Sequence, residues 1–308
     1  MLVTMIAFIS GVFAIFLIAS ISGALSERAG VVNISIEGFM TMGALSFAIA
    51  GSYMNAQDDS NWTQIIALLI AMVVSGVFAL LHGYASIRLK SNQVVVGTAI
   101  NILAQGIALY LATSGILGSD GTRIPTNYSV ISFDDNKNIF NLYLIIAVLI
   151  AATVGAFFTF TKIGKRYAAA GENPNAVDAA GINVIKYRYI AIVISGMLAG
   201  LSGAMFVVIK TSGSFRGSTD GWGFLALAIM IVGQWRIKFI APAALLFSIM
   251  FGLGEYLWSV DGVPNSFKDN ADLFKVLPFI GSLLVMIIFS KWSQAPKASG
   301  IPFDKSKR

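Results

Sequence analysis

The sequence predicts an all-α integral membrane protein, a polytopic bundle of about nine transmembrane helices. Three observations support this fold class. Of the 308 residues, 56% are hydrophobic and only 12% are charged, whereas soluble domains carry about 25% charged residues. The charged residues are clustered between apolar runs long enough to cross a bilayer. Thirty glycines are distributed along the chain, and small residues let helices pack closely within lipid.

The apolar runs place the predicted helices within a single transmembrane domain over residues 1–308. They lie at residues 3–24, 32–54, 64–84, 94–116, 141–160, 189–210, 222–235, 239–258 and 273–290. Their soft boundaries allow a count between eight and ten. A straight transmembrane helix needs about 20 residues, and the seventh run is shorter than that. We therefore expect the seventh run to be tilted, broken or re-entrant.

The first run is expected to remain in the protein as a helix. No Lys or Arg precedes Arg28, so the run lacks the charged start of a secretory signal peptide.

The second run begins with the polar residues Asn33, Ser35 and Glu37. A carboxylate at the centre of a bilayer costs about 2.5–3.5 kcal/mol on insertion scales, so we expect Glu37 to face the interior of the bundle. With Gly38 easing an irregular helix start, these three side chains would line a solute pathway. The alternative is that Glu37 only ties helices together, through Arg28, another buried donor or a backbone amide.

Polar side chains also mark the fourth run. Asn92 and Gln93 stand at its start, and a spacing of four places Gly97, Asn101 and Gln105 on one helix face. Uncharged amides suit a neutral, hydroxyl-rich or heterocyclic solute better than an ion. Asn92, Gln93, Asn101 and Gln105 are therefore predicted to line the same pathway. The alternative is a set of amide hydrogen bonds between helices.

The loop at residues 161–188 carries the signals of a short helix. Asn173 suits the N-cap, Pro174 the first helical position and Gly181 a left-handed C-terminal cap. The helix, about two turns long, is too short and too polar to span a membrane. We predict that it lies at the cytoplasmic surface and docks onto another protein. An ordinary capped loop helix would show the same signals.

The positions of Lys and Arg indicate the orientation. With the N-terminus outside, fifteen of the 21 basic residues fall in inner loops or in the tail at residues 291–308. An excess of Lys and Arg marks cytoplasmic loops. The N-terminus is therefore predicted to be extracellular and the C-terminus cytoplasmic. The same distribution argues against a nucleic-acid partner, because the basic residues lie in separate loops and not on one face.

An enzymatic function lacks candidate residues. His82 is the single histidine, cysteine is absent, and nothing near His82 forms a catalytic triad or a metal-ligand pattern. No P-loop segment occurs, so ATP hydrolysis would belong to another subunit. The sequence thus predicts no catalytic residue, no metal site and no cofactor.

Four segments, in this order, resemble the branched-chain amino acid, ribose and nucleoside permeases of ATP-binding-cassette (ABC) importers. They are residues 26–38, which contain Asn33 to Gly38; residues 91–101, which contain Asn92 to Asn101; residues 171–182 with 186–189; and residues 223–235. The matching stretches are most similar to the nucleoside or simple-sugar branch of that family.

The resemblance implies a permease subunit in the cell membrane that forms half of the pathway for a nucleoside. Ribose or another simple sugar is the first alternative solute, and a branched-chain amino acid is the second. The implied partners are a cognate ABC ATPase, a second permease subunit that is a paralogue or a second copy, and an extracellular solute-binding lipoprotein. The residues implied in ATPase coupling are Gly171, Glu172, Asn173, Pro174, Asp178 and Gly181.

A transporter of a different class is the remaining alternative. An ion-coupled secondary transporter or a channel would need charge within its spans, and Glu37 and Glu255 are the carboxylates that the sequence offers there.

Overall fold

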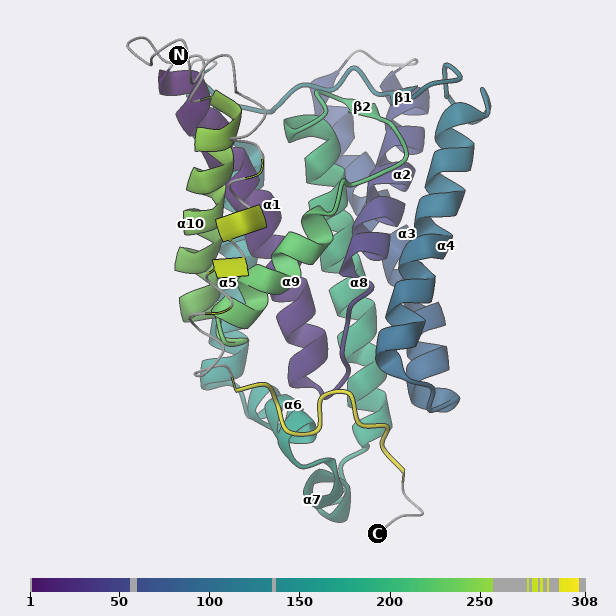
Figure 1. Cartoon of the computed structure of the whole chain (residues 1–308), viewed down its shortest axis with the longest axis vertical. Helices are drawn as coiled ribbons and strands as arrows, with labels where there is room; N and C mark the ends of the chain where they lie inside the picture. The colour runs from purple at the N-terminus through teal and green to yellow at the C-terminus, as the bar shows by residue number, and fades with distance from the viewer. Residues whose placement is uncertain are drawn as a thin grey trace.

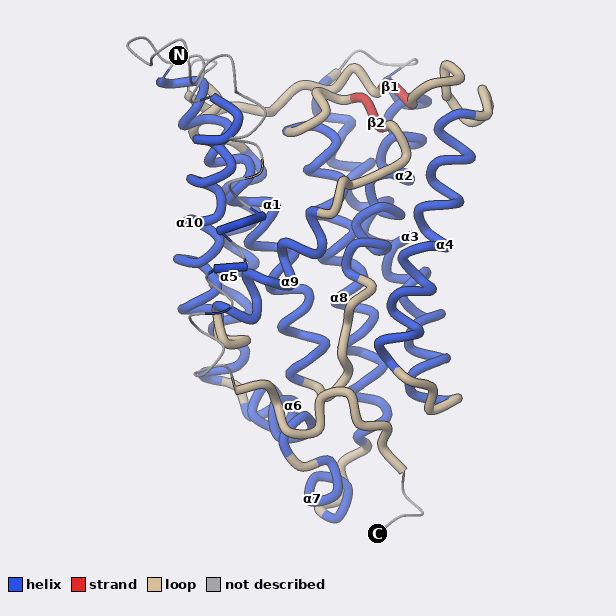
Figure 2. The backbone as a smooth tube through the Cα atoms, viewed as in Figure 1, coloured by secondary structure: helices blue, strands red, loops and turns tan. Residues whose placement is uncertain are grey.

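The computed structural model describes residues 2–55, 60–134, 137–256, 276, 279–281, 283–284, 287 and 294–304. The described chain is a bundle of helices with one pair of very short strands (Figures 1 and 2). The bounds of these elements are α1 Leu2–Arg28, α2 Ile36–Asn55, α3 Gln64–Gly83, α4 Gln93–Thr113, α5 Leu142–Phe160, α6 Lys162–Glu172, α7 Pro174–Ala179, α8 Val184–Ile209, α9 Trp222–Val232, α10 Ile237–Tyr256, β1 Ile124–Pro125 and β2 Ser214–Phe215.

Six helices in the described part of the chain are long and apolar enough to cross a membrane. They are α1, the continuous helical stretch Asn61–Arg88 that contains α3, and α4, α5, α8 and α10. This confirms the prediction of a multi-pass helical membrane protein. The seventh predicted run is the eleven-residue α9, which is too short to cross a bilayer alone. The ninth predicted run, residues 273–290, lies mostly outside the described residues.

The two ends of the bundle differ. Strands β1 and β2 pair antiparallel, Ile124 with Phe215, at the end where α1 begins. We call this the strand end. Helices α6 and α7 and the tail at residues 294–304 lie at the opposite end, which we call the α7 end. The long helices run between these two ends.

Helices α1, α2 and α8 form the centre of the core. Helices α1 and α8 run in opposite directions (Figure 1), and α2 packs against α8. Glycines make this close packing possible, because a Cβ added to Gly203 would collide with the Met40 carbonyl and one added to Gly43 would collide with the Gly200 backbone.

Two membrane elements are broken near mid-height. After α1, residues 29–35 climb from the α7 end without helical structure, and α2 begins only inside the bundle (Figure 1). After α8 and β2, residues 216–221 descend from the strand end, and α9 begins inside the bundle. Discontinuous helices of this kind are a recurring way to place polar backbone groups at the midplane of a transporter. The second run has the irregular start that was expected. Of the three alternatives for the seventh run, the short α9 after an irregular segment favours a broken helix.

Candidate functional site

The two helix starts meet at mid-height, and we call this meeting point the junction. It comprises residues 32–38 before and within α2, and residues 219–223 before and within α9. Backbone groups in both stretches have no partner within their own helix. Polar side chains from elsewhere in the chain supply those partners.

The extended segment before α2 is held on one side by α3 and α8. The Asn33 amide donates to the hydroxyl of Ser195 at 2.7 Å, and the Ser35 hydroxyl donates to Asn33 Oδ1 at 2.9 Å. His82 Nδ1 lies 2.9 Å from Ser35 Oγ, and its Nε2 lies 3.2 Å from the Val32 carbonyl. Asn33, Ser35 and His82 are fully buried, so this network fixes the path of the backbone.

Helix α4 holds the same segment on the other side. The Val32 amide donates to Gln93 Oε1 at 2.7 Å. Asn101 makes two hydrogen bonds, donating to the Ile34 carbonyl at 2.9 Å and accepting from the Gly38 amide at 2.8 Å. Asn101 therefore satisfies the backbone on both sides of the point where α2 begins.

Glu37 joins the two helix starts. Its carboxylate accepts from the Thr219 hydroxyl at 2.8 Å, the Gly221 amide at 2.9 Å and the Gly223 amide at 2.6 Å. Helix α9 begins after Gly221, which has a φ of 80° and no side chain to cap the helix. A carboxylate at a helix N-terminus satisfies free amides and complements the helix dipole. Glu37 thus caps α9 from the first turn of α2.

The other end of α9 is tied to α1. Trp235 follows the helix, and its indole Nε1 donates to the Glu27 carboxylate at 2.6 Å, with both side chains buried. Glu27 and Glu37 lie on either side of residues 29–35 in the sequence. Their carboxylates therefore fix the two ends of α9.

The structure brings five of the seven predicted pathway residues together. Asn33, Ser35, Glu37, Gln93 and Asn101 all contact or belong to residues 32–38. Two others lie apart from this network.

Asn92 and Gln105 are those two, and both are exposed, Asn92 directly before α4 and Gln105 within it. Asn92 caps α4, accepting from the amides of Val94 and Val95. Gln105 lies one turn beyond Asn101 along the same helix.

Of the partners expected for Glu37, a buried donor and backbone amides are present: Thr219 and the amides of Gly221 and Gly223. Arg28, the other expected partner, instead stacks on Phe158 at 4.0 Å from the ring centroid. Glu27 was not singled out for a role. One signal was available for α9: Gly221 stands directly before an apolar helix that lacks a capping side chain of its own.

The predicted loop helix forms at the α7 end. Asn173 Oδ1 accepts from the Ala176 amide, and Pro174 is the first residue of α7. Gly181 has a φ of 78° and its amide donates to the Asp178 carbonyl. These contacts confirm the predicted caps. Glu172, Asn173 and Gly181 are exposed, whereas Gly171 is buried.

Helix α6 precedes α7 and was not predicted. Thr161 caps it by accepting from the Gly164 amide. It docks onto the end of α1, where the Tyr167 hydroxyl donates to the Leu25 carbonyl at 2.7 Å. Burial raises the pKa of the Tyr167 hydroxyl, so it stays a hydrogen-bond donor. A Cβ on Gly171 would collide with the Arg28 carbonyl, so α6 ends directly against the start of residues 29–35.

The tail crosses beneath the bundle at this end (Figure 1). The Ala298 amide donates to the Gly171 carbonyl at 2.8 Å, and the buried Arg188 donates to the Ile301 carbonyl at 3.0 Å. Phe303 packs with Val177 of α7 and Val184 of α8 in a small apolar cluster. The tail therefore fastens α7 to the start of α8.

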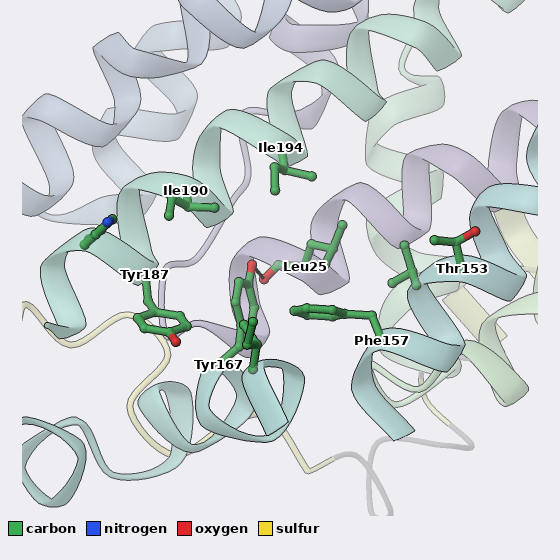
Figure 3. A pocket seen from close by; sticks show the side chains of 10 residues that line it. Leu25, Thr153, Phe157, Tyr167, Tyr187, Ile190 and Ile194 are labelled. Atoms are coloured by element: carbon green, nitrogen blue, oxygen red, sulfur yellow. Dashed lines mark hydrogen bonds between the residues drawn. The ribbon is translucent and has the colours of Figure 1, made fainter. Parts of the chain in front are cut away.

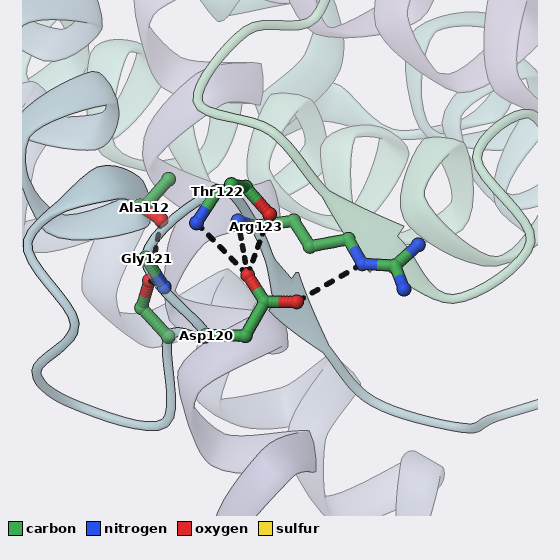
Figure 4. A network of polar contacts seen from close by, with 6 residues as sticks. Ala112, Asp120, Gly121, Thr122 and Arg123 are labelled. Carbon is green, nitrogen blue, oxygen red and sulfur yellow. Dashed lines mark hydrogen bonds and ion pairs between the residues drawn. The ribbon is translucent and has the colours of Figure 1, made fainter.

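A tight turn organises the strand end. Asp120 accepts from the amide and hydroxyl of Thr122, and from the amide and Nε of Arg123 (Figure 4). These hydrogen bonds hold the pKa of the exposed Asp120 carboxyl below its usual range. The turn leads directly into β1.

No group of three or more His, Cys, Asp or Glu side chains within the described residues could hold a metal ion. The polar groups of the junction instead satisfy one another and the backbone.

The sequence of residues 5–288 matches the family described as "Branched-chain amino acid transport system / permease component". An uncharacterized Mycoplasma pneumoniae protein is 36% identical over 298 residues, covering 95% of this chain and 93% of its own length. The nucleoside ABC transporter permease protein NupC of Lactococcus lactis is 31% identical over 303 residues, covering 94% of this chain and 92% of its own length. The guanosine ABC transporter permease protein NupQ of Bacillus subtilis is also 31% identical over 303 residues, covering 95% and 93%.

No solved structure gives a significant match. The sequence matches, with six membrane-length helices in the described residues, establish a multi-pass protein of the cell membrane. The chain therefore belongs to the permease-component family of branched-chain amino acid transport systems and is a membrane-spanning transport subunit, not a catalytic one.

Proposed function

We propose that this chain forms half of the translocation pathway of an ABC importer for nucleosides. The observation that carries the proposal is the similarity, over more than nine tenths of the chain, to two permeases named for nucleoside and guanosine transport. The second half of the pathway would come from another permease subunit, a paralogue or a second copy. A separate ABC ATPase would hydrolyse ATP, and an extracellular lipoprotein would deliver the solute.

We assign the α7 end to the cytoplasm. Most of the described basic residues cluster at that end: Arg28, Arg88, Lys90, Lys162, Lys165, Arg166, Lys186, Arg188, Arg236, Lys238 and Lys297. An excess of Lys and Arg favours the cytoplasmic side. If each broken element counts as one crossing, the described residues supply eight crossings, and the ninth predicted run, residues 273–290, lies mostly outside the described residues. In this proposal the N-terminus is outside and the C-terminus is inside.

The pathway would run beside the junction. In this proposal Asn33, Ser35, Gln93 and Asn101 act by fixing residues 32–38 and not by direct contact, because they are buried or nearly so. Glu37 is less deeply buried, and Asn92 and Gln105 are exposed. The exposed amide of Gln105 suits hydrogen bonding to a neutral, hydroxyl-rich solute.

The α7 helix would receive the ATPase. The exposed Glu172, Asn173 and Gly181 would contact it, while Pro174 and Asp178 set the shape of the helix and the buried Gly171 anchors it. A push on α7 would reach α6, and then the Arg28 carbonyl against which Gly171 packs. Residues 29–35 follow directly and lead to the junction. Movement of one rigid element against another is a usual way to alternate access.

A sugar is the second candidate solute. A putative glucose ABC transporter permease protein of Haloferax volcanii is 28% identical over 292 residues, covering 90% of this chain and 84% of its own length. This identity is lower than that of the two nucleoside permeases.

Competition for uptake distinguishes the solutes. Cells that express the complete transporter should accumulate labelled guanosine, and unlabelled nucleosides should compete while ribose, glucose and leucine should not. Competition by ribose or glucose, with none by nucleosides, would identify a sugar as the transported solute.

Coupling is tested separately by co-purifying the cognate ATPase with Glu172→Ala or Pro174→Ala variants. Undiminished complex formation and uptake would remove α7 from the ATPase contact.

A further inference from the structure

An apolar groove of about 450 Å³ opens between α5 and α8 near the α7 end (Figure 3). Leu25 of α1 lies at its floor, Ile190 and Ile194 project from α8, and Phe157 projects from α5. Tyr167 of α6 closes the groove towards the α7 end. The residues that line it are Leu25, Thr153, Val154, Phe157, Ile163, Tyr167, Lys186, Tyr187, Ile190 and Ile194.

The hydroxyls of Thr153 and Tyr167 are already used within the protein. Thr153 Oγ1 donates to the Leu149 carbonyl at 2.7 Å, and the Tyr167 hydroxyl donates to the Leu25 carbonyl at 2.7 Å. The groove therefore offers an occupant mainly hydrocarbon and aromatic surface. A solute that needs several hydrogen bonds would not be satisfied there.

One positive charge stands at the rim. Lys186 is exposed and is the one charged side chain among the described residues that line the groove. Lys162 and Lys165 are exposed on α6, which forms the adjoining wall. An apolar slot with one lysine at its rim is complementary to an anionic amphiphile whose chain enters the slot and whose head group remains at the rim.

The depth of the groove fits the membrane. Its lining comes from the last turns of α1 and α5 and the first turns of α8, so it occupies the part of the bundle next to the α7 end. That is the level of the head groups and upper acyl chains of one leaflet. The side chains of Ile190 and Ile194 are exposed on the described chain.

We propose that this groove is a binding site for an anionic phospholipid, with an acyl chain between α5 and α8 and the phosphate at Lys186. The lipid would touch Ile163 and Tyr167, which belong to the helix that carries α7. An occupied groove would therefore brace α6 against α5 and α8. The site is separate from the junction and needs no particular transported solute.

Lipid retention provides the test. The purified full-length protein, with its partner subunits, is placed in nanodiscs of equal phosphatidylglycerol and phosphatidylcholine, and co-purifying lipids are counted by native mass spectrometry after gentle extraction. The parent should retain phosphatidylglycerol in preference. Lys186→Gln should lower that preference about fivefold, because one Lys near a membrane surface contributes about 1 kcal/mol towards an anionic lipid. Lys165→Gln, which changes a lysine outside the lining, should have a smaller effect.

Filling the groove should exclude the lipid. Ile190→Trp and, independently, Ile194→Trp should each abolish the retained phosphatidylglycerol, whereas Leu149→Trp on the exposed face of α5 should not. Thermal unfolding identifies a variant that fails to fold. Because two tryptophan variants are made independently, the test still holds if one of them fails to fold. Equal retention of both lipids by the parent, or retention unchanged in both groove variants, would overturn the site. So would a photo-cross-linker at position 190 that labels a partner subunit instead of lipid.

Discussion

The junction and the α7 end are both built around the start of a helix, but their partners come from different distances along the chain. At α7, Asn173 caps the helix by accepting from the amide three residues later, and the Gly181 amide donates to the Asp178 carbonyl three residues earlier. At the junction, Glu37 of α2 caps α9, and Asn101 of α4 holds the start of α2. The first arrangement lies at an exposed surface and the second in the interior. A local cap can form on an isolated loop, whereas the junction requires the whole bundle to be assembled.

This contrast predicts that substitutions at the junction affect the stability of the fold, while substitutions at α7 affect the contact with a partner. The largest effect is expected for Glu37→Leu. The change leaves the amides of Gly221 and Gly223 without their acceptor, while the Thr219 hydroxyl keeps Thr41 Oγ1 as a partner at 2.9 Å. Each unsatisfied buried donor costs about 1–3 kcal/mol, so we expect a loss of about 3 kcal/mol in the free energy of unfolding.

Denaturant titration of the purified protein in detergent measures this loss. Glu37→Gln keeps one acceptor oxygen and should be intermediate. A Glu37→Leu variant as stable as the parent would show that the carboxylate does not hold α9.

Gly203→Ala should have the next largest effect. The added methyl group would meet the Met40 carbonyl and push α2 away from α8, and such overpacking costs about 2 kcal/mol. Gly106→Ala on α4 is the matched control, because a Cβ there meets nothing within 4 Å. The control should be neutral or slightly stabilising, since Ala favours helix over Gly. Equal thermal stability of the two variants would contradict close packing between α2 and α8.

Asn101→Leu should cost about 1.5 kcal/mol, because the Ile34 carbonyl and the Gly38 amide lose their partner. Solute uptake should fall while assembly with the other subunits persists. Gln105→Leu sharpens the contrast. It should leave the free energy of unfolding unchanged, because the Gln105 side chain is exposed. It should still lower uptake, because the proposed pathway uses its amide to bind the solute. Uptake unaffected by Asn101→Leu would show that the position of the α2 start is unimportant for transport.

The smallest effect on global stability is expected at α7. Asn173→Ala removes a helix cap worth about 1 kcal/mol, and α7 is exposed, so the melting temperature should hardly change. Affinity for the cognate ATPase, measured by surface plasmon resonance, should fall about fivefold, which corresponds to the same 1 kcal/mol. Asn175→Ala, an exposed change within the same helix, is the control for general damage. An equal loss of ATPase affinity in both variants would show that the Asn173 cap makes no specific contribution to the ATPase contact.

The same contrast explains what could be predicted from the sequence. The long apolar helices follow from composition, and the caps of α7 follow from residues within one turn of each other. The start of α8 was predicted too late, because Asn183 caps the helix at Val184 and the buried Arg188 lies inside it. Helix α6 was missed because its polar, amphipathic sequence resembles that of a loop.

The junction could be predicted only in part. An intramembrane carboxylate and a polar helix face indicate inward-facing groups, and Glu37 and Asn101 do face inward. The partners of Glu37 lie in a segment far along the chain, and no local pattern pairs residue 37 with residues 219–223. The extended backbone of residues 29–35 needs the surrounding helices to satisfy it, so its course follows from tertiary packing.

Reconstitution tests most directly the claim that this subunit forms a conduit moved by a separate motor. Proteoliposomes with the chain, its second permease subunit and the cognate ATPase should accumulate labelled guanosine when ATP is supplied on the ATPase side. Vesicles without the ATPase, or with ATP replaced by ADP, should show no accumulation. Flux of the solute through vesicles that contain this chain alone, without nucleotide, would contradict the account.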